Sequence, residues 1–284
     1  MTQTHAQKQP QKILVTGATG TVGRQVVAEL LARGHAVRAL TREPSRASLP
    51  ADVEVVRGDL TEPYGMAQAL EGVTGLHLIT FGDAFFTPLE TGPRILELAR
   101  AAGVRRVTVL HGGGETPLED AVRADGGVDW TVLMPVEFMA NALEWADGIA
   151  AADEVREPFV SRLSAMVHEG DIGAVAAVAL TEEGHGGREY VITGPEVLTV
   201  GDKVAAIAAA RGRDIALVEL SEEEAVARWR AAGHSEEVIG FLLHVYGNTP
   251  EAGRTVTGTV EEVTGRPARS FARWAAEHAD AFKA

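Results

Sequence analysis

Short runs of β-branched and aliphatic residues alternate, in the first half of the chain, with segments whose apolar residues recur at helical spacing. The runs predict strands at residues 12–16, 36–40, 53–56, 76–80, 107–110 and 130–134. After the first run, Val22, Val26, Val27 and Leu30 predict a helix that ends at Gly34. Runs without polar alternation are typical of strands buried on both faces. The pattern therefore predicts an α/β fold with a doubly wound parallel Rossmann sheet.

The pattern becomes less regular after Pro135. It predicts a helix at 172–180, a strand at 190–193, a helix at 200–210, and a helical stretch at 222–246 with a break at 232–234. We expect three parts: a disordered polar arm at residues 1–11, the Rossmann domain at 12–150, and a smaller, mostly helical lobe at 151–284. Part of this lobe is expected to return to the sheet.

A glycine-rich loop joins the first predicted strand to the first predicted helix. Its glycines allow a tight turn, close approach of a phosphate, and close packing of the helix on the strand. Backbone N–H groups and the positive end of the helix dipole converge there, which suits a pyrophosphate. The alternative is a glycine turn that binds nothing. The loop predicts dinucleotide binding by Gly17, Thr19, Gly20, Thr21, Val22 and Gly23.

The residue type at the end of the second strand distinguishes between dinucleotides. An NAD site usually has an acidic side chain there for the ribose hydroxyls, whereas this chain has Arg42, followed by Arg46. Because guanidinium groups bind phosphates well, these arginines favour NADPH and NADP; the alternative is a solvated basic loop. After the third strand, we expect Asp59 to accept the adenine amino group and Leu60 to cover the ring.

Charge and composition exclude several classes of function. Forty acidic and 26 basic residues give a formal net charge of −14, which disfavours a nucleic-acid partner. The chain has no cysteine, so disulfides, cysteine nucleophiles and thiolate metal sites are ruled out. Its nine histidines show no metal-ligand spacing. Because it has neither a long apolar run nor a secretory signal, we expect a cytoplasmic protein without a membrane span.

Motifs spread over nearly the whole chain carry a resemblance to a known family. They are the glycine loop at 17–23, Leu-Thr-Arg at 40–42, Gly-Asp-Leu at 58–60, Asp-Trp-Thr-Val-Leu-Met-Pro at 129–135, Phe-Met-Ala-Asn at 138–141, Asp-Ile-Gly-Ala-Val-Ala at 171–176, Tyr-Val-Ile-Thr-Gly-Pro-Glu at 190–196 and Val-Thr-Gly-Arg-Pro at 263–267. Together they resemble the NmrA-like branch of the atypical short-chain dehydrogenase/reductases. The resemblance implies either NADPH-dependent reductases of quinones and ketones or dinucleotide-binding regulators, so it fixes the fold better than the function.

Most short-chain reductases use a tyrosine with a lysine four residues later, and this sequence lacks that pair. No lysine follows Tyr64, Tyr190 or Tyr246 at that spacing, and none lies between Ile13 and Asp202. The usual proton relay is therefore in doubt. Hydride transfer is not, because that chemistry belongs to the nicotinamide.

His111 is the candidate that replaces the missing proton donor. It directly follows the fifth strand, where the family layout has a serine or threonine, and it leads into the backbone run 112–114. We expect His111 to donate the proton or to anchor the substrate. The alternative is a histidine that only packs on the cofactor or caps the strand.

Other expected contacts come from segments near the carboxyl ends of the strands and from the late helical stretch. Glu137 and Asn141 also follow the sixth strand, where they can face the pocket, but surface or capping roles suit them at least as well. The late helical stretch is expected to form a lid over a flat, hydrophobic substrate, an ordinary amphipathic helix being the alternative. The expected contacts are Thr80 and Phe81 at the nicotinamide ribose, Pro135, Val136 and Phe138 near the nicotinamide, and Phe241, His244 and Tyr246 in the lid.

Three functions follow from this reading. The first is an NADPH-dependent reductase that transfers hydride to the ketone or quinone carbonyl of a small hydrophobic aromatic molecule. Its narrowest form is a ketoreductase of aromatic polyketides, of angucyclinone type, in antibiotic biosynthesis. The second is a dinucleotide-sensing regulator without turnover, and the third is an isomerase or dehydratase that uses bound dinucleotide. In the first, the proton comes from His111, from water or from a phenol on the substrate.

Overall fold

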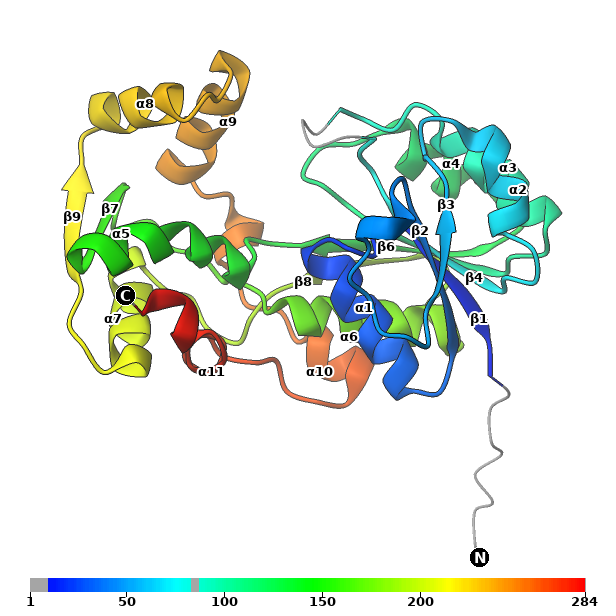
Figure 1. Cartoon of the computed structure of the whole chain (residues 1–284). Helices are drawn as coiled ribbons and strands as arrows, with labels where there is room; N and C mark the ends of the chain where they lie inside the picture. The colour runs from blue at the N-terminus through cyan, green and yellow to red at the C-terminus, as the bar shows by residue number, and fades with distance from the viewer. Residues whose placement is uncertain (1–9, 83–86, 284) are drawn as a thin grey trace, which may run out of the picture. The chain divides into compact units, whose positions relative to one another are not determined.

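The computed structural model describes residues 10–82 and 87–283, and its central feature is a parallel sheet (Figure 1). Within these residues the sheet has seven strands in the order β3-β2-β1-β4-β5-β6-β8, with parallel pairing from β3 through to β6. This arrangement confirms the predicted Rossmann-type α/β fold. The strands are β1 Lys12–Val15, β2 Ala36–Thr41, β3 Glu54–Arg57, β4 Gly75–Ile79, β5 Arg106–Leu110, β6 Asp129–Pro135 and β8 Arg188–Ile192.

Helices cover both faces of this sheet. Figure 1 shows α1 and α6 on one face and α2, α3 and α4 on the other. The close approach of α6 to α1 needs Gly173, since a Cβ there would lie 2.6 Å from the backbone of Gln25. The helices and 3₁₀ turns are α1 Thr21–Ala32, η1 Pro44–Arg46, η2 Pro63–Gly65, α2 Met66–Ala69, α3 Gly92–Ala101, α4 Pro117–Ala124 and α6 Glu169–Thr181.

The strand order reverses between β1 and β4, and this places the ends of these two strands side by side. The glycine loop follows β1, and Thr80 and Phe81 follow β4. In doubly wound sheets such a reversal is where ligands bind, at the carboxyl ends of the strands. The topology therefore brings together two segments that are about 60 residues apart in the sequence.

Contacts divide the chain into two compact units. Unit 1 comprises the chain up to Met134 together with Ile172–Tyr190, and unit 2 comprises Pro135–Asp171 and Val191–Ala284. This division differs from the expected boundary at residue 150. The expected arm at 1–11 lies largely outside the described residues; the backbone N–H of Gln11, which is described, donates to His35 Nδ1 at 3.2 Å.

Unit 2 contains a two-stranded parallel sheet and several helices. The strands are β7 (Glu154–Pro158) and β9 (Ala216–Leu220), paired along their whole length. Its main core includes Met139, Ile149, Phe271, Trp274 and Phe282. The other elements are η3 Met139–Trp145, α5 Ala146–Ala152, α7 Val200–Arg211, α8 Glu222–Ala231, α9 Glu236–Gly247, η4 Glu251–Arg254, α10 Thr259–Thr264, α11 Phe271–Glu277 and η5 Ala279–Phe282.

The predicted break in the late helical stretch separates α8 from α9, and each helix has its own cap. Ser221 accepts a hydrogen bond from the Glu224 backbone at the start of α8, and Ser235 accepts one from the Val238 backbone at the start of α9. A small cluster of Ala225, Trp229 and Ile239 packs the two helices together. Among the described residues, no helix is long and apolar enough to cross a membrane.

One buried histidine gives the fold a pH dependence. His77 lies in β4, where its Nδ1 is 2.8 Å from Thr108 Oγ1, and its Nε2 is buried without a partner among the described residues. Burial lowers the pKa of His77 from 6.5 to about 4. Between these values the unfolded chain binds a proton that the folded chain does not. The stability that His77 contributes is present above pH 6.5 and lost as the pH falls towards 4, about 3 kcal/mol in all.

We therefore expect the wild type to lose more stability on acidification than the His77→Gln variant. Urea unfolding at pH 7 and pH 4.5 measures the two losses. The wild-type loss should exceed that of the variant by about 2–3 kcal/mol. Equal losses would show that His77 does not set this part of the pH dependence.

Candidate active site

The glycine loop after β1 forms a tight cradle at the start of α1. Gly17 has a φ of +61°, and the Gly20 backbone donates to Gly17 O at 2.9 Å. A Cβ on Gly23 would lie 2.0 Å from Gly17 O, so only glycine fits there. Gly20 caps α1 without a side-chain hydrogen bond, which leaves the first N–H groups of the helix open to an anion. The cradle fits the pyrophosphate of a dinucleotide.

Within this loop, the side chains differ in exposure. Thr21 is exposed, Thr19 is half-buried, and Val22 is buried on the sheet side of α1. Arg24 holds the loop in place: its Nε donates to Thr19 O at 2.7 Å and its guanidinium to Ser48 O at 2.7 Å. The sequence reading did not single out Arg24. Nothing in its spacing distinguishes it from an ordinary exposed helix residue.

The two arginines after β2 differ in what they contact. Arg46 forms an exposed ion pair with Glu43 at 3.0 Å. Arg42 is exposed, and its guanidinium has no hydrogen bond or ion pair within the part of the chain that the structure describes. Arg57 lies opposite Thr41 in the register of β3 and adds a third basic residue at this edge. Of the two arginines after β2, Arg42 is thus the one that remains available to a phosphate within the described residues.

The expected adenine contacts lie directly after β3. Asp59 is half-buried, and its Oδ1 accepts hydrogen bonds from the backbone N–H and the hydroxyl of Thr61, at 2.9 Å and 2.7 Å. Leu60 is buried in the core of unit 1. One carboxylate oxygen of Asp59 therefore fixes the turn, and the other is left for a ligand.

The residues after β4 pack against the loop after β5. Thr80 is fully buried, and its hydroxyl donates to Leu110 O at 3.4 Å. The ring of Phe81 lies on Gly112, where a Cβ would be 1.9 Å from a ring carbon. Gly113 has a φ of +99°. Gly112 therefore leaves the space that the Phe81 ring occupies.

His111 is held by a buried carboxylate. Its Nδ1 lies 2.8 Å from Glu119 Oε1, with the His111 side chain 13% exposed and the Glu119 side chain fully buried. Glu119 Oε2 accepts hydrogen bonds from the backbone N–H and the hydroxyl of Thr116, closing a capping box at the start of α4. The backbone N–H of His111 donates to Leu133 O at 2.9 Å. Both the backbone and the ring of His111 are therefore fixed.

The sequence reading missed Glu119, although a signal was present. Thr116, Pro117 and Glu119 form the Thr-x-x-Glu pattern of a capping box, which predicts a helix start. The pattern does not reveal that the second carboxylate oxygen reaches the histidine at the end of β5. That contact depends on the packing of α4.

The segment after β6 opens unit 2 and is fixed by its backbone. Pro135, Val136 and Phe138 are half-buried. The Val136 backbone donates to Ile192 O at 3.1 Å, and Phe138 forms a β-bridge with Val167. Asn141 is exposed on η3.

The residues expected in a lid all lie on α9, in unit 2. Phe241 is 57% exposed and His244 is exposed. Tyr246 is half-buried, with its ring 4.2 Å from the guanidinium carbon of Arg162 and 6.2 Å from the ring of Trp229. Burial and the charge of Glu137 raise the pKa of the Tyr246 hydroxyl, which therefore stays protonated.

Comparison with known proteins now identifies the family. The sequence profile of the NAD(P)H-binding family matches residues 17–124. The chain is 39% identical over 285 residues to the (4-alkanoyl-5-oxo-2,5-dihydrofuran-3-yl)methyl phosphate reductase of Streptomyces griseus, covering 95% of this chain and 99% of the relative. The chain belongs to the NmrA-like atypical short-chain dehydrogenase/reductases.

Two solved structures agree with this fold. The NADPH complex of a quinone oxidoreductase from Escherichia coli gives a TM-score of 0.76 at 23% identity, covering 93% of this chain and 99% of that one. NmrA, a negative transcriptional regulator solved with NADP, gives a TM-score of 0.71 at 18% identity, covering 95% of each chain. With a full-length relative that is a named reductase, this NmrA-like protein is an NAD(P)H-dependent oxidoreductase.

The three tyrosines of this NmrA-like protein have different surroundings. Tyr64 is 90% exposed, and the Tyr190 hydroxyl lies 2.8 Å from His185 Nδ1. Tyr246 packs on Arg162, as described above. None of the three lies in the catalytic Tyr-x-x-x-Lys spacing.

Two of the family motifs have structural roles in unit 2. Asp171 accepts hydrogen bonds from the backbone and the guanidinium of Arg269, both at 2.7 Å. Glu196 accepts one from the Phe271 backbone at 3.1 Å. These carboxylates anchor the C-terminal segment, so the two motifs that contain them stabilise the fold of unit 2.

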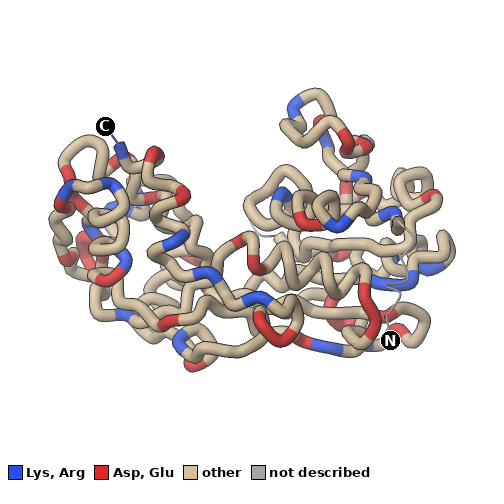
Figure 2. The backbone as a smooth tube through the Cα atoms, turned by 90° about the horizontal axis from the view of Figure 1, so that it is seen from below, with Lys and Arg blue, Asp and Glu red and all other residues tan. Residues whose placement is uncertain are grey.

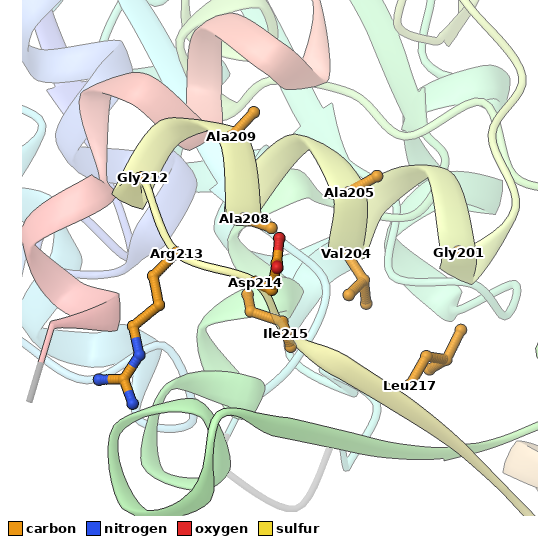
Figure 3. Close-up of a pocket in the computed structure, with 10 residues that line it drawn as sticks. All are labelled: Gly201, Val204, Ala205, Ala208, Ala209, Gly212, Arg213, Asp214, Ile215 and Leu217. Atoms are coloured by element: carbon orange, nitrogen blue, oxygen red, sulfur yellow. The ribbon is translucent and has the colours of Figure 1, made fainter.

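A wide, open cavity in unit 2 contains none of the expected site residues. It has a volume of about 820 Å³ and lies between α7 and the segment that leads into β9. Figure 3 shows Val204 and Ala208 on the side of α7 that faces Ile215 and Leu217. Its lining is mostly apolar and small: Gly201, Val204, Ala205, Ala208, Ala209, Gly212, Arg213, Asp214, Ile215 and Leu217.

The charged residues of the described chain are interspersed in sign. Figure 2 shows acidic and basic positions mixed along both units. Within the described residues, no cluster of His, Asp or Glu is arranged to hold a metal ion.

Proposed function

We propose that this protein is an NADPH-dependent reductase that delivers hydride to a ketone or quinone carbonyl and takes the matching proton from His111. The single observation that carries the proposal is the buried Glu119–His111 pair at the carboxyl end of β5. A fixed imidazole at the carboxyl end of β5, in the same sheet as the glycine loop that follows β1, is suited to general acid catalysis. In this proposal, unit 1 binds NADPH through the glycine loop and holds His111.

The tautomer of His111 follows from its partner. In this proposal His111 donates its Nδ1 hydrogen to Glu119 Oε1, which lies 2.8 Å away. Nε2 is then the atom that holds and releases a proton. When bound, the nicotinamide supplies the hydride, and the proton on Nε2 goes to the carbonyl oxygen. His111 thereby takes the role that a Tyr–Lys pair has in most short-chain reductases.

The cofactor preference rests on Arg42. Its guanidinium has no partner among residues 10–82 and 87–283, and it follows β2, where an acidic residue would bind the ribose hydroxyls of NADH. A 2′-phosphate placed there gains charge-assisted hydrogen bonds from Arg42. Arg46 contributes less, because Glu43 already pairs with it.

The proposed substrate is small, hydrophobic and rich in conjugated carbonyl groups. The Streptomyces relative is named for a methyl phosphate ester that carries an alkanoyl-substituted oxo-dihydrofuran ring. That ring is a conjugated carbonyl system, and it is this part of the name, not the phosphate, that supports the proposal. The exposed Phe241 and the half-buried Tyr246 on α9 suit an aromatic molecule. An aromatic polyketide ketone meets this description, and we propose the cytoplasm as the site of reaction.

Anaerobic NADPH oxidation, followed at 340 nm, tests this function. The substrates are 1,4-naphthoquinone, menadione and a set of polycyclic aromatic ketones, and the products are identified by mass spectrometry. We expect oxidation of one NADPH for each molecule of substrate reduced. Tight NADPH binding with no oxidation across the set would instead support a regulator without turnover.

A further inference from the structure

Unit 2 contains a lysine whose charge is completely enclosed. Lys203 lies on the inner face of α7 with Val200, Val204 and Ile207, and its side chain has no exposed surface. Its Nζ donates to Glu137 Oε2 at 3.1 Å. The chain has only four lysines, and this one reaches the segment that follows β6.

Glu137 differs from Lys203 in that part of it remains accessible. Its side chain is 21% exposed. Its backbone is fixed from both sides: Glu137 O accepts from the Val167 backbone at 2.9 Å, and the Met139 backbone donates to Val167 O at 2.9 Å. A carboxylate on such a rigid backbone, held by a buried ammonium, points in one direction only.

The surroundings keep Glu137 ionised. Burial alone would raise its pKa, but the charge of Lys203, the nearby Ser164 hydroxyl and the charge of Arg162 outweigh burial, so the pKa lies below the usual value. Burial lowers the pKa of Lys203, while Glu137 opposes that shift. Glu137 is therefore negatively charged, and it is the partly exposed member of the pair.

Stability alone does not account for this pair. Removing two charges from water costs several kcal/mol for each ion, and apolar residues of similar size are often as stable or more stable. A buried pair that leaves one carboxylate accessible is what a polar contact with a ligand needs. If the pair only joined α7 to the segment after β6, two apolar residues would do so without the free-energy cost of removing two charges from water.

The cations around Glu137 are already paired. Arg162 lies 3.4 Å from Glu157 Oε2, and Arg228 lies 3.1 Å from Glu157 Oε1. Tyr246, above Arg162, keeps its proton. Because these arginines are paired with Glu157, the group that remains for a ligand is the Glu137 carboxylate, which is a hydrogen-bond acceptor. Hydrogen-bond donors on the ligand suit Glu137, and anionic groups do not.

We propose that Glu137 binds a hydroxyl group of the substrate as a charged hydrogen-bond acceptor, and that Lys203 is the positioning residue that holds its carboxylate. This inference deepens the proposed function, because it rests on the protein being a reductase of aromatic carbonyl compounds. It names the substrate class as hydroxylated aromatic carbonyl compounds. A hydroxyl that donates to Glu137 also orients the ring, so the interaction selects among otherwise similar ketones and quinones.

A matched pair of probes tests the proposal: 6-hydroxy-1,4-naphthoquinone and its methyl ether. Binding of each to the complex with NADP is measured by tryptophan fluorescence quenching, and reduction of each is measured with NADPH. Hydrogen bonds to a charged group are worth enough for the wild type to prefer the hydroxyl compound by about tenfold or more in Kd. Equal Kd values, or no binding of either probe, would overturn the proposal.

Glu137→Gln should reduce this preference by about tenfold, because a neutral acceptor binds the hydroxyl more weakly. The control is Glu154→Gln, which breaks an exposed ion pair with Arg156 in the same unit and should leave the preference unchanged. The Glu137→Gln/Lys203→Met double variant removes both charges, so it checks the result if the single variant folds poorly. Retention of the full preference in a folded Glu137→Gln or double variant would overturn the proposal.

The role of Lys203 is tested by a pH profile of the same preference. In Lys203→Met the carboxylate loses its buried partner, so its pKa rises and the preference should develop only at higher pH. The other groups that act on Glu137, or on which it acts, remain in this variant: Arg162, Glu144, Tyr246 and the hydroxyl of Ser164. A profile identical to that of the wild type would show that Lys203 has only a structural role.

The two proposals fail in different ways. If the wild type reduces both probes without preferring the hydroxyl compound, the reductase function stands and the role of Glu137 is wrong. The opposite outcome is also informative. Suppose that the wild type prefers the hydroxyl compound in binding and that Glu137→Gln loses this preference, but that NADPH is not oxidised in the presence of either probe. The role of Glu137 then stands, and the proposed reaction is wrong.

Discussion

Replacement of His111 by glutamine is expected to lower kcat for quinone or ketone reduction by about 100-fold to 10,000-fold, the usual contribution of a general acid. Glutamine is similar in size to histidine, but it cannot hold and release a proton at neutral pH. Because His111 lies outside the glycine loop, the Kd for NADPH should stay within about twofold of the wild-type value. Steady-state kinetics and fluorescence titration with NADPH measure the two effects.

Two further variants sharpen this test. Glu119→Gln keeps the side-chain shape but no longer holds the Nδ1 hydrogen with a charge, so kcat should fall by a smaller factor. His234→Gln changes an exposed histidine on the loop between α8 and α9 and should leave kcat unchanged. Wild-type turnover in His111→Gln would transfer the role of proton donor to solvent or to a phenol of the substrate.

The Arg42→Ala variant is expected to weaken NADPH binding by about tenfold to a hundredfold while changing NADH binding by less than about twofold. The two cofactors differ only in the 2′-phosphate, so a selective loss identifies the group that Arg42 contacts. Isothermal titration calorimetry gives both Kd values. Because the contact is between charges, the difference should also decrease as the salt concentration rises.

Other arginines provide the controls for this prediction. Arg46→Ala should have a smaller effect, because Arg46 is already paired with Glu43. Arg94→Ala removes an exposed arginine of α3 that pairs with Glu97, and it should have no effect on either cofactor. Equal losses of NADPH and NADH affinity in Arg42→Ala would contradict the assignment of the 2′-phosphate contact.

The sequence predicts the sheet well because its signals are local. Buried strands show as continuous apolar runs, and the strand order then follows from alternating strands and helices. Gly17 and Gly23 are equally predictable, since a positive φ and a contact of 2.0 Å each require glycine. Such features depend on a few neighbouring residues, so a single sequence reveals them.

The division into two units was less predictable. Residues 172–180 are apolar on all sides, which marks a fully buried helix but does not say which core buries it. In the structure this helix packs on α1, so residues from the expected small lobe belong to unit 1. The sequence predicts that part of this lobe returns to the sheet, but local periodicity does not show which core buries the returning helix.

The pairings that matter for chemistry are the hardest to predict. Arg42 and Arg46 look alike in the sequence, and only the structure shows that Arg46 forms an ion pair with Glu43. The sequence predicts Glu119 as part of a helix cap, and the structure shows that it also contacts the His111 ring. Lys203 and Glu137 are 66 residues apart. Each pairing depends on how helices pack, which short-range spacing does not encode.

The most direct test of the central claim is single-turnover oxidation of NADPH by an aromatic quinone, with deuterium placed in turn at each of the two C4 positions of the nicotinamide. If the protein transfers hydride, oxidation proceeds and one of the two labelled cofactors, but not the other, reacts more slowly than unlabelled NADPH. If NADPH binds and is not oxidised, or if neither label slows the reaction, the protein is not the reductase proposed here.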